Sequence, residues 1–317
     1  MNVPVSLAEA AYAAARWGWL LATFLLLGAG SYAPFLFRTR TALHTTDPAV
    51  AIELARRARL TGLVAGFLLL ALSLVRLELQ AKSLVDPSES VTWEFLRTLL
   101  GSSWGKGWLR QLIMAALALV GFAVARREQW SHAGWLLAVA AGGGLGFTAG
   151  MTGHANTARA GLGGLLLDAA HVWAGGLWLG GLAVLLIAGL GACHRASSSE
   201  RPALIRALVA DFSRRALVFA PLTVGLGIWL AAHYLGWRWP FHLAESTYGW
   251  VLVGKLAALA GVVALGGYNW RITQSRIAKD GGEARLRRFS GWELFFGALL
   301  LGLTAVLVAL PLPEGRM

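Results

Sequence analysis

The sequence predicts an all-α membrane protein, a bundle of about eight transmembrane helices with both chain termini on the outer, periplasmic side. Of its 317 residues, 57% are hydrophobic and 14% are charged, whereas soluble domains carry about 25% charged residues. Eight apolar stretches reach the roughly 20 residues that a helix needs to cross the hydrocarbon core of a bilayer. We therefore expect one membrane domain over residues 1–317, with the lipid bilayer as its surroundings.

Each apolar stretch is expected to be helical, because lipid offers no hydrogen-bond partner to a free backbone group. The predicted spans are 16–37, 60–79, 108–125, 134–151, 165–190, 216–235, 249–270 and 292–310. The long loop 80–107 between the second and third spans has an amphipathic pattern, which predicts a short helix at the membrane surface. The inner halves of the spans contain few polar residues.

The distribution of positive charge predicts the orientation. The loops after the first, third, fifth and seventh spans hold 18 of the 28 Lys and Arg residues, and the opposite side holds nine. Basic residues accumulate in cytoplasmic loops, so both termini are predicted outside. The same distribution explains the net charge of +12 without a nucleic-acid partner. The one remaining cation, Lys255, lies inside the seventh span.

Candidate metal ligands gather around the outer end of the fifth span, in the stretch MTGHANTARAGLGGLLLDAAHVW. His154 lies in the preceding outer loop and His171 inside the span, where polar groups are costly and usually functional. Imidazole and thioether ligands suit copper, so we predict a copper site of His154 and His171. Met151 and His233, at the ends of neighbouring spans, are further candidate ligands. A single cysteine and four methionines exclude a Cys-rich or Met-rich relay.

Two charged residues are predicted to support this site. Asp168 is three residues before His171 and shares its helix face, so its carboxylate could orient the imidazole ring. Lys255, about two turns into the seventh span, must snorkel, pair or lose its proton. We hypothesise an Asp168–Lys255 ion pair. Replacing both residues with alanine should then cause a smaller loss than replacing either one alone. The alternatives are a histidine that only joins helices, a solvated loop histidine, and a methionine that only packs.

Several stretches in a fixed order resemble the copper-resistance protein D (CopD) family of bacterial inner-membrane proteins. They are GHAN at 153–156, LLLDAAHVWAGGLWLGGL at 165–182, DFSRRAL at 211–217, STYGWVLVGKLAAL at 246–259, NWR at 269–271 and ELFFGALLLGLTAVLVALPLP at 293–313. The resemblance covers about residues 60–313. It implies a multi-pass inner-membrane protein that carries copper (Cu⁺ or Cu²⁺) inward and is not an enzyme. It also implies a separate periplasmic CopC-like copper-binding partner. The family's histidines carry over to His154 and His171, with Asp168 and Lys255 at matching positions.

Two other functions remain open on the sequence. A b-type haem electron-transfer protein also uses membrane histidines, as axial ligands, and an absorption spectrum would identify it. A copper-binding assembly factor or sensor would hold the metal at the outer face without transport, and vesicle uptake would distinguish it. The chain has no Walker A sequence (GxxxxGK[ST]), which argues against an ATP-driven pump. Because neutral imidazole is the ligand form, copper binding should weaken below about pH 6.

Overall fold

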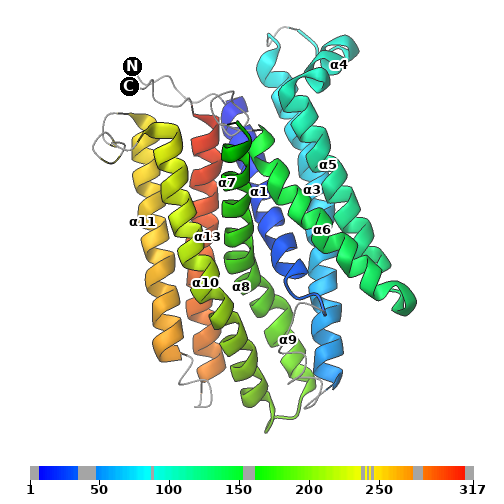
Figure 1. Ribbon diagram of the computed structural model, residues 1–317, viewed down its shortest axis with the longest axis vertical. Coiled ribbons are helices and arrows are strands. Elements are labelled where there is room, and N and C mark those ends of the chain that lie inside the picture. The colour runs from blue at the N-terminus through cyan, green and yellow to red at the C-terminus, as the bar shows by residue number, and fades with distance from the viewer. Residues whose placement is uncertain are drawn as a thin grey trace.

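The computed structural model describes residues 7–34, 48–86, 89–152, 161–236, 240, 243, 246–273 and 281–310. Throughout these ranges the regular elements are helical, and eight helical segments are long and apolar enough to cross a membrane. The helices run side by side in one bundle (Figure 1). The prediction of an all-α polytopic bundle is therefore confirmed.

Seven of the eight spans are built around one long helix each. These helices are α1 (Leu7–Gly30), α3 (Pro48–Leu84), α5 (Ser103–Val124), α6 (Ser131–Ala149), α10 (Arg201–Leu235), α11 (Thr247–Tyr268) and α13 (Gly282–Ala309). We call the end of the bundle at which α3, α10 and α13 begin the inner end, and the opposite end the outer end. In Figure 1, α1 begins and α13 ends at the same, outer end, as an even number of spans requires.

The remaining span, Gly161–Arg195, is the most deeply buried of the eight. It comprises α7 (Gly161–Gly175), α8 (Gly181–Val184) and α9 (Leu190–Ala192), joined by two π-helical turns, Gly176–Gly180 and Leu185–Gly189. α1 packs on this span and also contacts α3, α6 and α13. The closest approach pairs two glycines, because a Cβ on Gly28 would overlap the main chain of Gly180. Close contact at small residues is a common way for membrane helices to pack.

Helix boundaries depart from the prediction mainly at the inner end. α3, α10 and α13 begin 10 to 15 residues before the predicted starts at 60, 216 and 292, because their inner segments carry charged residues and hydropathy marks only the apolar part. The first span is shifted towards the N-terminus. It ends at Gly30, and residues 31–34 form a turn rather than the predicted helix. The short helix predicted in the loop 80–107 is present as α4 (Trp93–Gly101), capped by Thr92, whose Oγ1 accepts from the Phe95 amide at 3.2 Å.

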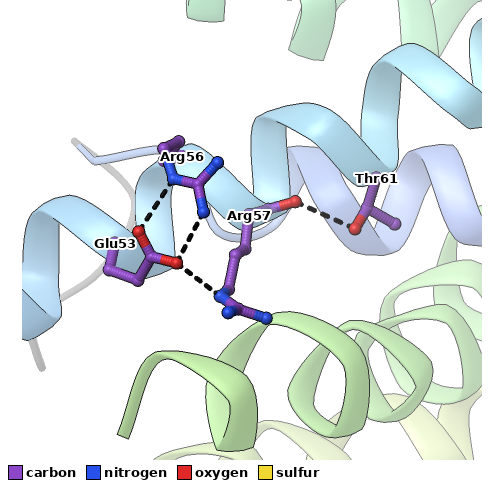
Figure 2. A network of polar contacts seen from close by, with 4 residues as sticks. All are labelled: Glu53, Arg56, Arg57 and Thr61. Carbon is purple, nitrogen blue, oxygen red and sulfur yellow. Dashed lines mark hydrogen bonds and ion pairs between the residues drawn. The ribbon is translucent and has the colours of Figure 1, made fainter. Parts of the chain in front are cut away.

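Towards the inner end of the bundle, three carboxylates each pair with two arginines. In α3, Glu53 accepts hydrogen bonds from Arg56 at 2.7 and 2.8 Å and from Arg57 at 2.6 Å (Figure 2). Arg57 also packs on Gly191 of the fifth span. The same arrangement recurs at Asp211 with Arg214 and Arg215, and at Glu283 with Arg201 and Arg287. Each trio leaves one net positive charge at the inner end, in keeping with its predicted cytoplasmic orientation.

Candidate functional site

The outer half of the bundle contains a cavity of about 230 Å³ between α1, α7, α10, α11 and α13. Most of its wall is apolar. The polar side chains in the wall include Arg16, Asp168, His171, Tyr234 and Lys255. Three residues predicted as a ligand or its supports, Asp168, His171 and Lys255, therefore line one cavity, although they come from two spans that are distant in sequence.

The imidazole of His171 is held in a defined tautomer by α10. Its Nδ1 lies 3.0 Å from the carbonyl oxygen of Thr223. A carbonyl only accepts, so Nδ1–H donates and Nε2 keeps its lone pair. Gly227 leaves room for the ring, because a Cβ there would lie 3.1 Å from His171 Cε1. A metal-binding histidine is typically fixed in this way, through its second ring nitrogen.

The contacts predicted for the two supporting residues are not seen among the described residues. The Thr223 carbonyl, rather than the Asp168 carboxylate, orients His171. Asp168 and Lys255 line the same cavity together with the buried Arg16, but across the described residues no direct ion pair joins Asp168 to either cation. The three charges therefore interact across the cavity, where a low dielectric strengthens their coupling.

Two of the other candidate ligands, Met151 and His233, are not among the described residues of the cavity wall. His154 lies outside the described residues. Met151 packs on α5, where its sulfur is 3.6 Å from Arg110 Nη1, and His233 is exposed, with its ring 5.2 Å from that of Tyr234. In the described part of the chain, no group of three or more His, Cys, Asp or Glu side chains is placed to hold a metal ion. His171 is thus the candidate ligand that the structure places in the cavity.

A buried polar network that the sequence analysis missed holds Thr152, two residues before His154. Arg16 Nη1 donates to the Thr152 carbonyl at 3.1 Å, and Arg76 Nη2 and Gln111 Nε2 each donate to its hydroxyl at 3.1 Å. Arg76 is fully buried and also donates to Gln111 Oε1 at 3.0 Å. The network fixes the outer end of the fourth span. A charged residue inside the predicted span 60–79 is the signal that could have found it.

Two polar atoms in the cavity wall keep unused hydrogen-bonding capacity. The Tyr234 hydroxyl and the Arg16 Nε are buried without a hydrogen-bond partner among the residues that the structure describes. Buried polar groups in folded proteins are nearly always satisfied by protein or by ordered water.

Fold and cavity together define a polytopic helical membrane protein with an imidazole, a carboxylate and two cations around a cavity in its outer half. Comparison with protein families identifies the lineage. Residues 7–165 match the copper resistance protein D-like N-terminal domain, and residues 206–307 match copper resistance protein D. The chain belongs to the copper resistance protein D (CopD) family, as the sequence motifs predicted. Neither a curated protein nor a solved structure matches it.

Membership of this family implies a function in copper resistance or transport, in a family of multi-pass membrane proteins that are not known as enzymes. The bacterial inner membrane is consistent with this. The matched ranges include the first span, which the motifs alone did not cover. Asp168 and His171 lie between the two ranges.

Proposed function

We propose that the protein carries copper ions across the bacterial inner membrane towards the cytoplasm, with its first binding site at the outer cavity. His171 supplies one ligand through Nε2, and His154 supplies another. The observation that supports the proposal is the His171–Thr223 hydrogen bond of 3.0 Å, which leaves Nε2 of this cavity-lining histidine with a lone pair that can bind a metal. Met151 and His233 remain further candidate ligands.

The charges around the cavity suit a site that a copper ion occupies in passing. Arg16 and Lys255 repel a cation, and Asp168 attracts it, so the cavity does not hold an excess of negative charge. An ion bound mainly by imidazole in such surroundings is released more readily than one held by several carboxylates. The inside-negative membrane potential then favours inward movement by about 2.3 kcal/mol per unit charge per 100 mV. We propose that a periplasmic CopC-like protein delivers the ion to the outer face.

Copper titration of the purified full-length protein tests the site. Cu(I) and Cu(II) are added in turn to the wild type and to the His154→Ala, His171→Ala and His132→Ala variants, while absorption spectra are recorded. His132 is the matched control, because it is an exposed histidine at the inner end of α6. We expect stoichiometric binding that is lost in the first two variants and kept in the third. Unchanged binding in all variants would show that the two histidines only pack, and a Soret band would favour the haem function.

Uptake by proteoliposomes tests transport itself. Vesicles with the wild-type protein should accumulate copper faster than protein-free vesicles, and the His171→Ala variant should not. Copper binding without uptake would identify an assembly factor or a sensor instead. Adding Met151→Leu and His233→Ala to the binding series tests the two remaining candidates, since a true ligand lowers copper affinity when it is replaced.

A further inference from the structure

A second cavity, of about 260 Å³, lies in the inner half of the bundle between the fifth span, α10, α11 and α13. Its wall is apolar apart from a few side chains, among them Asn269, Ser290 and Glu293. Glu293 is the one ionisable side chain among the described residues of this wall. The inner half, which the sequence suggested to be nearly devoid of polar groups, thus contains a carboxyl group in a cavity.

Among the described residues, Glu293 has a hydrogen-bond partner but no ion-pair partner. Its side chain is buried, and its Oε2 accepts from Asn269 Nδ2 at 3.1 Å. Asn269 Nδ2 also lies 3.4 Å from the hydroxyl of Ser290. The other carboxyl oxygen, Oε1, faces Gly266, where a Cβ would approach it to 3.1 Å. No ion pair in the described part of the chain includes Glu293.

Several charged groups on the packed elements have partners other than Glu293. On α10, Asp211 pairs with Arg214 at 3.2 Å and with Arg215 at 3.3 Å. Beyond Asn269, the guanidinium of Arg271 lies 6.0 Å from the ring centre of Trp270. On α13 itself, Glu283 pairs with Arg201 and Arg287. A carboxylate that is buried without a cation is strongly disfavoured and becomes neutral by binding a proton.

The two cavities lie in line through the membrane. The inner one is lined by residues 209–221 of α10 and the outer one by residues 223–235, and α11 and α13 likewise contribute one half to each. Trp178 lines both cavities and is buried. It belongs to the π-helical turn Gly176–Gly180, a distortion that often occurs at functional positions. A route along these helices from the outer cavity to the inner one would pass Trp178 before it reached Glu293.

We propose that the inner cavity is a proton-binding site. In the absence of copper the Glu293 carboxyl holds a proton taken from the cytoplasmic side. When a copper ion passes Trp178, the O–H bond breaks and the proton returns to water on the cytoplasmic side, so one positive charge in the cavity replaces another. This second step rests on the proposed copper transport, whereas proton binding by Glu293 does not.

Infrared spectroscopy of the protein in lipid bilayers tests the proton directly, because a protonated carboxylic acid has a C=O stretching band that a carboxylate lacks. Near neutral pH we expect such a band, shifted in D₂O, lost in Glu293→Gln and retained at a changed frequency in Glu293→Asp. Glu283→Gln is the matched control on the same helix. Its carboxylate lies 2.7 Å from Arg201, so its replacement should leave the band unchanged. A band of full intensity in Glu293→Gln would overturn the proposal.

Copper uptake at a series of internal pH values tests the coupling. The wild-type rate should depend on internal pH, and Glu293→Gln should keep copper binding at the outer site but lose this pH dependence. An unchanged pH profile in Glu293→Gln would refute the coupling. Absence of uptake in the wild type, with the infrared band intact, would instead refute transport and leave the proton site standing.

Discussion

Replacing Thr152 with valine should destabilise the outer end of the bundle and weaken copper binding together. The substitution keeps the shape of the side chain and removes its hydroxyl. That hydroxyl accepts from Arg76 Nη2 and Gln111 Nε2, both at 3.1 Å, within a buried network. Gln111 keeps its bond of 2.7 Å to the Thr148 carbonyl, so each donor loses one of its partners.

The size of the effect follows from the two lost hydrogen bonds. In soluble proteins, one hydrogen bond from a charged donor and one from a neutral donor together contribute about 2–4.5 kcal/mol to stability. In membrane proteins, two interhelical hydrogen bonds together contribute about 1–3 kcal/mol to stability. We expect the free energy of unfolding of Thr152→Val to fall by about 2 kcal/mol. Because Thr152 is two residues before His154, we also expect copper affinity to fall about 10-fold, as for other changes next to metal ligands.

Reversible unfolding in mixed detergent micelles, followed by tryptophan fluorescence, measures the first effect, and copper titration measures the second. Thr23→Val is the matched control. Thr23 is equally buried, but its hydroxyl donates only within α1, to the Trp19 carbonyl at 2.9 Å. Such a bond within one helix contributes little, so the control should change stability by less than about 0.5 kcal/mol. Equal losses in the two variants would refute the role assigned to the network.

Glycine substitutions provide two further predictions with one control, Gly225→Ala, whose new Cβ would meet no atom within 4 Å. Gly227→Ala should weaken copper binding about 10-fold because its Cβ displaces the His171 ring, and a titration curve matching that of the control would contradict this. Gly180→Ala should lower the free energy of unfolding, since overpacking against the Phe24 carbonyl costs about 1–3 kcal/mol and outweighs a helix-propensity gain of about 1 kcal/mol. The control should be stabilised in the same unfolding assay, and stabilisation of Gly180→Ala would show that the helices separate freely there.

The sequence predicted those features that each segment carries by itself. Eight spans were predictable because every span must be apolar, and Asp168, His171 and Lys255 stood out because charge and imidazole are rare in such segments. The contact that orients His171 was not predictable, since its partner is a main-chain carbonyl of α10 and has no residue signature. Glu293 was overlooked because one acidic residue near the start of a span looks like a helix end. Only packing shows that it faces a cavity.

The dependence of copper uptake on the membrane potential tests how the proton of the inner cavity moves when a copper ion passes. Outward exchange of one proton for each Cu⁺ would move no net charge, and uptake would not respond to an imposed potential. If the proton instead returns from Glu293 to the cytoplasm, it does not offset the charge that the copper ion carries across the membrane. The potential then contributes about 2.3 kcal/mol per unit charge per 100 mV to copper uptake. Because Glu293 lies in the inner cavity beyond Trp178, we expect the second behaviour. A potassium gradient with valinomycin, inside negative, should accelerate Cu⁺ uptake, and a rate independent of the gradient would show that a proton crosses the whole membrane.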